Sequence, residues 1–594
     1  MKISQIEIFN WRSIAHESIE SKNLMIFIGQ NNHGKSNILT AIQFFFGEIP
    51  HQNFDFHNES NELWIEMTFC ELNEQERVTF QKYVTNENRI KVRKSAIKND
   101  SFSYYGYVEE PKNEWLKETS ISNYLNRELA DRLPLSKFLP STGRITKDIF
   151  RQAQKDYIKE NKESLVFDYH LEITNFLGAK NVAKGSFGDL YFIPSIKNAT
   201  DELSPKGNSI FSNLYSRVVN KMSETNTEYI EAKKKISELI KILNKTDENG
   251  TPNTQRPSDL GMLETIIDAE LNAWNTKIDI EITPPNIDDI FKVGTHVLVD
   301  DGIKTDISRK GHGLQRALIF ALIKAWSQIL KQEEEVAAAN GEDVTISSRV
   351  GSKSTYFIFE EPELFLHPQA QKELFSSLVN LSENNNQVFL CTHSSSFLDL
   401  AYHESICIVK KNSIEEGTKI VQCTEAIFSG IDERKEFNMS YWINPDRSEL
   451  FFAKKIILVE GQTDKSVIPM IAKELDVFKF EYSIIDCGSK NNIPQYINLL
   501  NKFRLSYVAV YDRDHQGHKD PKSIVTADIS SRTIEDAVDS QLGRTVIFEN
   551  DIEQELGMTE STGNNKAYNA ISFVNREDFT VSDQLKAKVK SIYA

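Results

Sequence analysis

Short apolar runs that end in glycine or acidic residues recur along this chain of 594 residues. The runs Leu24–Ile28, Tyr356–Phe359 and Val388–Cys391 contain no charged residue, which is typical of strands buried on both faces of a parallel sheet. Between residues 37 and 46, apolar residues return at helical spacing. Buried strands that alternate with amphipathic helices predict an α/β fold.

A second block with the same alternation occupies residues 450–594. Its strand-like runs cover residues 455–459, 483–485 and 507–511, and each run is followed by an acidic residue. Residues 546–548 form a further strand-like run. This block predicts a separate, smaller α/β domain.

The central region has a helical pattern instead. Residues 209–245 carry a long helical pattern, a polar loop follows, and Asp259 is a plausible N-cap for a second helix. We expect a helical hairpin that serves self-association. The predicted segments are the first part of the larger domain (1–208), a helical insertion and candidate dimerisation region (209–277), the second part of that domain (278–440) and the C-terminal domain (450–594).

Composition limits the possible function classes. Hydrophobic residues make up 40% of the chain, but no run is long enough to predict a membrane span. The N-terminus lacks a secretory pattern and the five cysteines are scattered, so a cytoplasmic protein is expected. The net charge of −17 argues against coating nucleic acid through overall charge. The basic clusters Arg89–Lys94 and Lys233–Lys235 are either solvated faces or parts of a local groove.

The residues Gly29–Ser36 fit the phosphate-binding pattern G-x-x-x-x-G-K-[ST]. They lie between a predicted buried strand and a predicted helix, which is the context that this motif requires. Glycines let backbone N–H groups surround phosphate oxygens, and the helix N-terminus adds partial positive charge. We expect Lys35 to reach the β- and γ-phosphates and Ser36 to bind Mg²⁺. A chance glycine turn is the alternative.

Three later motifs extend this site. Gly311 and Gly313 follow Ser308 at a predicted helix start and form either a second phosphate nest or a flexible turn. The strand that ends at Glu360 and Glu361 predicts one acid for Mg²⁺ and one that polarises water, unless both belong to a solvated turn. His393 ends another buried strand and is either a γ-phosphate sensor or a structural histidine.

Three acids also stand at the ends of strands in the C-terminal block. Glu460 follows one strand, and Asp512 and Asp514 follow another. If these strands are parallel, the carboxylates meet at one sheet edge, where like charges repel and raise the pKa of one another. Divalent metal explains such a cluster, because carboxylate oxygens suit Mg²⁺ or Mn²⁺. Three unrelated acidic turns are the alternative.

The first group of motifs resembles the ABC-type ATPase head of the SMC and RecF class. That resemblance implies that two heads sandwich ATP, with Lys35 of one copy facing the glycine motif of another. The motif Arg-Lys-Gly-His-Gly-Leu-Gln after Ser308 departs from the form found in transporters, and Glu360 stands where transporters use Asp. The implied nucleotide contacts are Gly29, Asn31, Asn32, Gly34, Lys35, Ser36, Asn37, Arg12, Gly311, Gly313, Gln315 and His393.

The pattern Glu-Gly-x-x-Asp, followed by a strand and Asp-x-Asp, resembles a TOPRIM domain with a Rossmann-like fold. By motif matching, the implied metal-binding acids are Glu460, Asp464, Asp512, Asp514 and Glu553. Lys566 is implied as a basic group that stabilises charge on the scissile phosphate. Ser36 and Glu360 are the implied metal contacts of the ATPase head.

An ABC-type head followed by TOPRIM is the arrangement of the OLD family of ATP-dependent endonucleases. The resemblance implies a nucleotide-regulated DNA endonuclease that uses ATP and Mg²⁺ or Mn²⁺ and forms a homo-oligomer, either a dimer or a dimer of dimers. The family includes antiphage effectors such as the Gabija nuclease subunit and retron-associated effectors, which implies a defence-system partner protein or retron RNA or DNA as further partners, and no membrane. Two alternatives stay open: a RecF-like repair ATPase with a non-cleaving TOPRIM module, and a TOPRIM-bearing primase or topoisomerase.

Overall fold

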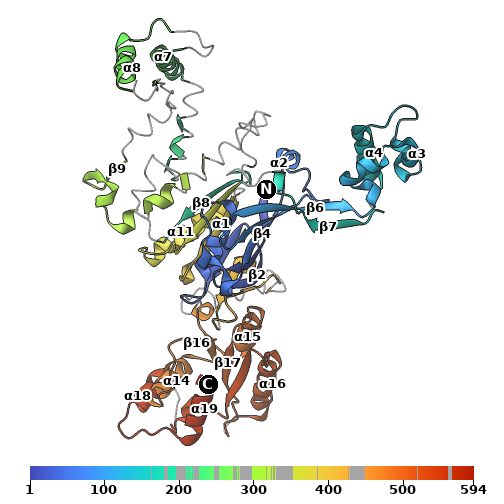
Figure 1. The fold of residues 1–594 in the computed structure, drawn as a ribbon. Helices are drawn as coiled ribbons and strands as arrows, with labels where there is room; N and C mark the ends of the chain where they lie inside the picture. Colours follow the sequence, from blue (N-terminus) through green and yellow to red (C-terminus); the bar gives the residue numbers. More distant parts are fainter. Residues whose placement is uncertain are drawn as a thin grey trace. The chain divides into compact units, whose positions relative to one another are not determined.

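A computed structural model gives the fold of the chain (Figure 1). It describes residues 1–161, 164–178, 185–195, 226–246, 253–271, 297–315, 354–383, 386–411, 413–425, 449–517, 519–558 and 565–594, with isolated residues between these ranges. The chain divides into two compact units, one of residues 1–195 and 345–594 and the other of residues 196–344. Among the described residues, no helix is long and apolar enough to cross a membrane.

The phosphate-loop motif belongs to a six-stranded, mostly parallel sheet. Its core strands are parallel, and only β14 runs antiparallel to its neighbour. The strands, in the order in which they lie side by side, are β14 (Lys419–Gln422), β13 (Ile406–Lys410), β3 (Leu24–Ile28), β12 (Asn386–Cys391), β11 (Thr355–Glu360) and β8 (Asp189–Ile193). The charge-free runs of the sequence are therefore central strands, as their patterning predicts.

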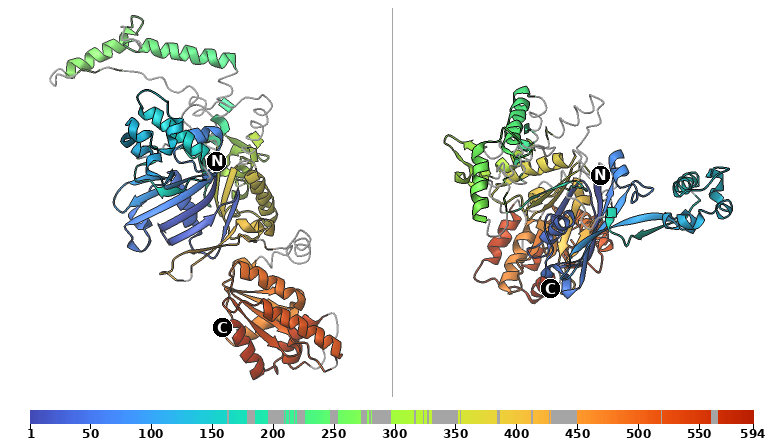
Figure 2. Two further views of the ribbon diagram at one scale, coloured as in Figure 1. Left: turned by 90° about the vertical axis from the view of Figure 1, so that its right-hand side faces the viewer. Right: turned by 45° about the horizontal axis from the view of Figure 1, so that its top comes forward.

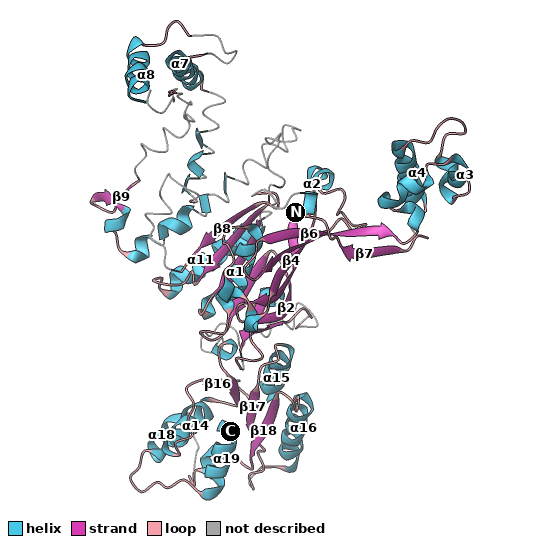
Figure 3. Cartoon of the chain, in the orientation of Figure 1, coloured by secondary structure: helices cyan, strands magenta, loops and turns pink. Residues whose placement is uncertain are grey.

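A second sheet of six antiparallel strands packs near the first. Its order is β2 (Ile14–Glu20), β1 (Lys2–Trp11), β4 (Glu62–Cys70), β5 (Ile90–Ile97), β6 (Phe102–Pro111) and β7 (Phe167–Leu171). Helix α1 (Lys35–Phe46) contacts both sheets, and buried residues of the helix and the two sheets form one continuous hydrophobic core. Helix α11 (Pro368–Glu383) packs on β12 (Figure 3). The helix that follows the phosphate loop is thereby fixed by a large core.

Strand β5 contains the basic run that the sequence suggested as a solvated face or groove. Lys91 and Arg93 both pair with the buried carboxylate of Glu66, so neither is a free surface charge. Lys94 points to the opposite side and is fully buried, where its ammonium group donates to the carbonyl of Phe44 in α1. Burial lowers the pKa of Lys94 to about 7. The second cluster, Lys233–Lys235, is exposed on a helix.

A small helical module is inserted between β6 and β7, in the region where the sequence pattern was weakest. It has a core of its own, which includes Leu135 and Phe150. Figure 1 shows it at the end of the β6–β7 ribbon. Its elements are η3 (Glu114–Leu116), η4 (Glu118–Tyr124), α3 (Arg127–Ala130), η5 (Pro134–Phe138) and α4 (Lys147–Glu160).

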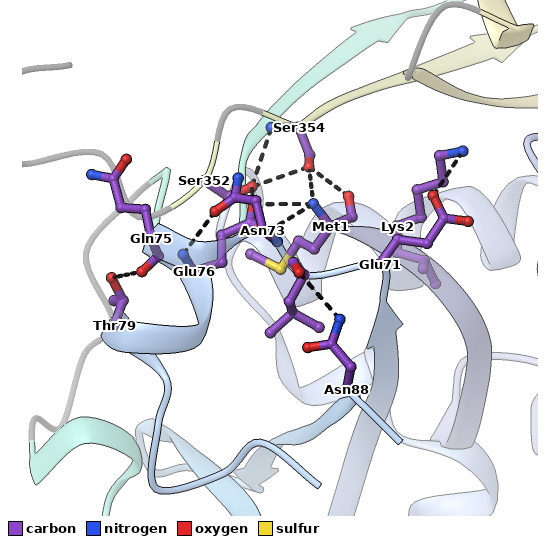
Figure 4. Close-up of polar contacts among 12 residues, drawn as sticks. Met1, Lys2, Glu71, Asn73, Gln75, Glu76, Thr79, Asn88, Ser352 and Ser354 are labelled. Carbon is purple, nitrogen blue, oxygen red and sulfur yellow. Dashed lines mark hydrogen bonds and ion pairs between the residues drawn. The ribbon is translucent and has the colours of Figure 1, made fainter. Parts of the chain in front are cut away.

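The buried carboxylate of Glu76 ties β1 to the segment before β11 (Figure 4). Glu76 lies in α2 (Glu74–Thr79) and is 1% exposed. Both of its oxygens lie 3.0 Å from the Met1 amino nitrogen, and the Ser352 hydroxyl donates to it as well. Ser354 contacts the same amino group at 2.8 Å. These bonds hold the start of the strand that ends at Glu360.

The unit of residues 196–344 contains two described helices in the region where the sequence predicts a helical hairpin, and their pairing as a hairpin stays a prediction. Its described elements include α7 (Thr227–Leu243), α8 (Ser258–Leu271), β9 (Leu298–Asp300), β10 (Lys304–Asp306) and η8 (Ile307–Arg309). Helix α8 begins at Ser258, so Asp259, the predicted N-cap, lies in its first turn instead. Glu264 of α8 is buried and accepts two hydrogen bonds from Arg256. The strand expected at residues 278–282 and the insertion expected at 332–354 fall almost wholly outside the described residues.

The C-terminal domain is a four-stranded parallel sheet with helices on both faces (Figure 2). Its strand order is β16 (Tyr482–Asp486), β15 (Lys455–Val459), β17 (Tyr507–Asp512) and β18 (Gly543–Phe548). Its helices are α14 (Gln462–Glu474), α15 (Ile493–Lys502), α16 (Pro521–Ala537), α17 (Ile552–Glu555), α18 (Lys566–Val574) and α19 (Asp583–Tyr593). Because all four strands are parallel, their acidic ends meet at one edge, as the Rossmann-like prediction requires.

Candidate functional sites

The phosphate loop connects β3 to α1 and leaves no room for side chains at its two glycines. Gly29 and Gly34 both have positive φ, at 149° and 99°. A Cβ atom on Gly29 would overlap the carbonyl oxygen of Val409, and one on Gly34 would overlap the Thr418 hydroxyl. Glycine is therefore required at both positions for steric as well as conformational reasons.

Lys35, the first residue of α1, has a buried and hydrogen-bonded ammonium group. Its side chain is 6% exposed, and Nζ donates to the carbonyl oxygens of Gly29 at 3.0 Å and Gln30 at 2.9 Å. Burial lowers the pKa of Lys35, while the nearby Cys391 thiol and the Glu361 carboxylate act in the opposite direction. The loop thus holds a positive charge at the start of a helix, where a phosphate group gains most.

Several other predicted residues surround this loop. Asn31, Asn32 and Ser36 are exposed, so their side chains are open to a ligand, whereas Asn37 donates to the Ser13 hydroxyl at 2.7 Å. Arg12 has a φ of 49° and donates to the buried Asp55 carboxylate at 2.8 Å. The sequence placed Arg12 near the nucleotide, and the next residue, Ser13, contacts the helix that follows the loop.

Ser13 and Thr418 were not predicted as part of this site. Their hydroxyl oxygens lie 2.7 Å apart, and Thr418 also donates to the carbonyl of His33 in the loop, at 2.8 Å. The two residues stand 405 positions apart in the chain, so no local pattern connects them. They hold the turn before β14 against the phosphate loop.

The paired acids stand at the end of β11, beside the strand that ends near His393. Glu361 has a φ of 45°, which is uncommon for a residue with a side chain, and its N–H donates to the Cys391 carbonyl at 2.8 Å. The Glu361 carboxylate lies 3.5 Å from Nε2 of His393. Burial lowers the pKa of His393 to about 4, with Lys35 adding to the effect, so the imidazole is neutral at pH 7.

Glu363 holds the backbone of His393 in place beside Glu361. Its carboxylate accepts from the backbone N–H of His393 at 2.6 Å, and burial raises its pKa. Glu360 is half-buried at the last position of β11. Because the backbones of His393 and Glu361 are both held, an acid and a neutral imidazole face each other at the edge of the sheet that also bears Lys35.

Gly311, Gly313 and Gln315 belong to the unit of residues 196–344. Residues 312–315 are helical, as expected for a motif at a helix start. The Gln315 side chain is buried and donates to the carbonyl of Lys310 at 2.8 Å. The contact of this motif with nucleotide stays a prediction.

Acidic side chains of the C-terminal domain meet where β15 and β17 end. Glu460 follows β15, and its Oε1 accepts from the backbone N–H of Asp512 at 2.7 Å. Asp464 lies in the first turn of α14 and is 6% exposed, and Glu553 lies in α17 and is 5% exposed. The Glu460 side chain is therefore held against the end of β17, the neighbouring parallel strand.

Burial and mutual repulsion raise the pKa values of the carboxylates in this cluster. Burial raises the pKa of Glu460 to about 7 and that of Asp464 to about 7, with the charge of Glu460 contributing to the shift of Asp464. Burial and the charges of Asp464, Glu460 and Asp514 raise the pKa of Asp512 to about 10. Glu553 also raises the pKa of Asp464. The cluster favours bound protons or cations at neutral pH.

The donor set fits a divalent metal ion. Oδ1 of Asp464 and Oδ1 of Asp512 are buried and have no hydrogen-bond partner among the described residues. Buried oxygens without partners are costly, and hard oxygen donors are the ligands that Mg²⁺ and Mn²⁺ prefer. Within the described ranges, no three His, Cys, Asp or Glu side chains stand close enough together, as they are arranged here, to hold a metal ion. The fit therefore rests on donor chemistry and on these two oxygens.

Two lysines and one further acid of this cluster were not predicted. Lys490, which follows β16, is 8% exposed, and its Nζ donates to the backbone carbonyl of Asp512. Lys519 pairs with Asp514 at 2.6 Å. Asp551 caps α17 and contributes to the raised pKa of Asp512. No local motif marks Lys490, because it lies 22 residues before the acid that it contacts.

The predicted basic helper, Lys566, has a different environment. It is the first residue of α18 and its side chain is exposed. A contribution of Lys566 to the chemistry stays a prediction.

Comparison with known proteins agrees with this two-part arrangement. Residues 1–398 match the family described as AAA ATPase domain, and residues 451–514 match the family described as Overcoming lysogenization defect protein-like, TOPRIM domain. The Old nuclease of Escherichia phage P2 is 22% identical over 528 residues, which cover 86% of this chain and 77% of that protein.

Two other relatives match shorter parts of the chain. The OLD nuclease of Thermus scotoductus is 26% identical over 34% of this chain and 35% of its own length. Endonuclease GajA of Bacillus cereus is 27% identical over 29% of this chain and 28% of its own length. Among solved structures, an SMC head bound to the C-winged helix domain of ScpA has a TM-score of 0.34 at 12% identity, over 71% of this chain and 98% of that one.

Proposed function

The chain belongs to the family of AAA ATPase domains over residues 1–398 and continues into an OLD-like TOPRIM domain, and on this premise we propose that it is a nucleotide-regulated, divalent-metal-dependent DNA endonuclease. The observation that carries the proposal is the carboxylate cluster, in which Asp464 and Asp512 each bury an oxygen without a partner. Burying such a cluster costs free energy unless cations bind to it, and metal-assisted phosphodiester cleavage is a reaction that uses bound cations.

The residues proposed to hold the ions are Glu460, Asp464, Asp512, Asp514 and Glu553. When bound, divalent ions supply an activated water and stabilise the leaving oxygen of a phosphodiester. The hydrogen bond from the backbone of Asp512 orients Glu460, so the two strand ends act as one unit. Lys566 is proposed to stabilise the charge on the scissile phosphate. The high pKa of Asp512 implies that metal must displace a proton from this acid.

The ATPase domain is proposed to control this centre. Lys35 binds the β- and γ-phosphates of ATP, Ser36 and Glu360 bind Mg²⁺, and Glu361 polarises the attacking water. The neutral imidazole of His393, held near Glu361, supports a role in sensing the γ-phosphate. The remaining proposed nucleotide contacts are Gly29, Asn31, Asn32, Gly34, Asn37 and Arg12.

Self-association completes the proposed nucleotide site. Gly311, Gly313 and Gln315 of one copy would face the phosphate loop of another, so ATP would be bound between two heads. The helices of residues 209–277 are proposed as the dimerisation region of a homodimer or a dimer of dimers. Exposed apolar side chains on α7 and α8, such as Leu239 and Met262, support this role.

A defence role is the biological part of the proposal. It rests on the OLD-like TOPRIM match and on the similarity to endonuclease GajA. The cell-level form of the proposal is a cytoplasmic antiphage effector whose substrate is DNA and whose further partner is a defence-system protein or retron RNA or DNA. Phage plating on cells that express the wild type or Glu460→Ala tests it directly, since only the wild type should reduce plaque numbers.

The biochemical test is cleavage of supercoiled plasmid by the purified full chain. We expect nicked or linear product with Mg²⁺ or Mn²⁺, no product with chelator, and a change in rate when ATP or a non-hydrolysable analogue is added. Glu460→Ala should abolish cleavage while the fold stays intact. Asp583→Asn is a matched control, because the Asp583 side chain is fully exposed on α19.

The alternative outcomes separate the candidate functions. Plasmid left uncut under all metal conditions would contradict the nuclease proposal and favour a repair ATPase of the RecF type. Relaxed plasmid without nicks would indicate a topoisomerase instead. Metal-dependent cleavage that survives in Glu460→Ala would show that the carboxylate cluster is not the catalytic centre.

A further inference from the structure

Lys490 is a buried cation in the middle of the acidic cluster, and the proposed chemistry assigns it no task. It is the first residue of a short turn, η13 (Lys490–Asn492), that follows β16. Its Nζ donates to the backbone carbonyl of Asp512 and lies 3.8 Å from Oδ2 of Asp514. The same ammonium group lies 5.4 Å from the ring centre of Tyr511. One side chain therefore touches both ends of the Asp512–Asp514 corner.

The peptide groups of Asp512 are held from two directions. Its N–H donates to the carboxylate of Glu460, and its carbonyl accepts from the ammonium group of Lys490. Two residues later, Asp514 has a φ of 65°, a left-handed conformation that residues with side chains adopt infrequently. A backbone in such a conformation persists where its surroundings hold it. Lys490 is the side chain that joins this residue to the end of β17.

Lys519 makes a useful contrast with Lys490. It pairs with Asp514 at 2.6 Å, but its side chain is 30% exposed, and the bond reaches only the carboxylate. Lys490 has a side chain that is 9% exposed, so water contributes little to its solvation. Burying an ammonium group is costly, and a leucine or methionine would fill the same space without that cost. The positive charge of Lys490, and not the space that its side chain fills, therefore explains why a lysine occupies this position.

We propose that Lys490 is a positioning residue of the carboxylate centre, which holds the Asp512–Asp514 corner so that both acids are presented to bound metal. This inference rests on the proposed function, because it assumes that the cluster binds divalent metal. Lys490 acts through the backbone of Asp512 and the carboxylate of Asp514, as outer-shell partners of metal ligands do. It is not a ligand itself, since an ammonium group has no lone pair to offer.

A purely electrostatic role would have the opposite consequence for metal binding. A fixed positive charge repels a divalent cation, so removal of that charge alone would tighten metal binding. Loss of a positioning bond weakens metal binding, because the acids are no longer held in place. Outer-shell substitutions of this kind cost about 10–100-fold in metal affinity or activity. The direction of the change in affinity therefore distinguishes the two roles.

The experiment measures Mn²⁺ affinity of the nucleotide-free full chain by titration calorimetry, together with its thermal midpoint without metal. The variants are Lys490→Met, which removes charge and donor, and Lys490→Gln, which removes the charge but keeps an N–H donor. Lys519→Met tests the half-buried partner of Asp514, and Lys586→Met, which lies on α19 with a side chain that is 42% exposed, is the neutral control. Plasmid cleavage gives kcat and KM for each variant.

We expect Lys490→Met to bind Mn²⁺ about 10–100-fold more weakly, and to lose kcat with little change in the KM for DNA. Lys490→Gln should fall between Lys490→Met and the wild type, and Lys519→Met should change affinity less than Lys490→Met does. Equal or tighter Mn²⁺ binding in Lys490→Met would overturn the inference. If that variant does not fold, Lys490→Gln decides by the same criterion, since tighter binding there contradicts positioning and weaker binding supports it.

Failure of the inference can be told apart from failure of the proposed function. A wild type that neither binds Mn²⁺ nor cuts plasmid contradicts the metal-dependent nuclease itself, and the inference falls with it. A wild type that does both, with Lys490→Met indistinguishable from it, contradicts only the positioning role. Weakened binding in Lys490→Met with wild-type behaviour of Lys586→Met supports both.

Discussion

The phosphate loop and the carboxylate cluster both stand at the carboxyl ends of parallel strands, but the protein stabilises their charges differently. In the loop, the buried ammonium group of Lys35 donates to two backbone carbonyls, so it has hydrogen-bond partners within the fold. In the cluster, Asp464 and Asp512 each keep a buried oxygen without a partner among the described residues. The loop is thus complete without a ligand, whereas the cluster needs protons or cations.

Because of this difference, we expect a substitution in the cluster to reduce cleavage strongly without lowering the thermal stability of the protein. Asp512→Asn removes a proposed metal ligand, so plasmid cleavage should fall by more than about 100-fold, the upper end of the loss found for outer-shell partners. The metal-free variant should unfold at a temperature close to that of the wild type, because Asp512 with a pKa of about 10 is already protonated and uncharged at neutral pH. Cleavage gels and calorimetry measure the two effects. A large drop in the thermal midpoint, absent in Asp583→Asn, would contradict the charge argument.

The phosphate loop should show a loss of binding instead. Lys35→Ala removes the ammonium group that is expected to contact the β- and γ-phosphates, so ATP affinity should fall by about 10–100-fold, since a hydrogen bond to a charged group contributes about 1.5–3 kcal/mol. Fluorescent-nucleotide titration measures the change. Lys372→Ala, on the exposed face of α11, is the matched control. Unchanged affinity in Lys35→Ala would overturn the assignment of the loop.

The ATPase domain also buries a lysine outside the loop, and the pH dependence of stability should reveal it. Burial lowers the pKa of Lys94 from 10.5 to about 7. Between these values the unfolded chain binds more protons than the folded one, so this lysine makes stability rise with pH across the window. Lys94→Met removes that slope, which amounts to at most about 1.4 kcal/mol per pH unit. Parallel curves of thermal midpoint against pH for the two proteins would contradict the prediction.

The smallest expected effect concerns Thr418, in the turn before β14 that contacts the phosphate loop. Thr418→Val keeps the side-chain shape but removes the hydroxyl that bonds Ser13 and the carbonyl of His33. The loss of these neutral bonds should cost about 1 kcal/mol each in stability and weaken ATP binding by less than about 10-fold. Denaturant unfolding and nucleotide titration check the two numbers. A loss of ATP binding as large as that of Lys35→Ala would give Thr418 a direct role that its contacts do not indicate.

Features determined by local pattern could be predicted from the sequence. The glycine loop, the acids at the ends of β11 and β17, and the parallel C-terminal sheet all follow from apolar runs and the residues that end them. Burial on both faces forces such runs to be continuously apolar, so the pattern is strong. The OLD-like arrangement was recognised through these same motifs, and the family matches confirm it.

Features that depend on distant residues could not be predicted. Ile90, Val92 and Lys94 occupy alternate positions of β5, but a lysine on the buried side breaks the pattern that identifies a strand. Its acceptability depends on the rings of Phe44, Phe102 and Tyr104, which come from other elements. Lys490 was missed for the same reason, since only the fold brings β16 and the end of β17 together.

We assign the control of cleavage to the phosphate loop of the ATPase domain and cleavage itself to the carboxylate cluster. One set of plasmid cleavage assays with Mn²⁺ tests this assignment most directly. The assay compares the wild type, Asp512→Asn and Lys35→Ala over a series of ATP concentrations. We expect Asp512→Asn to leave plasmid uncut at every ATP concentration, and Lys35→Ala to cut it at a rate that no longer depends on ATP. Cleavage by Asp512→Asn, or a rate for Lys35→Ala that still follows ATP as in the wild type, would contradict the account.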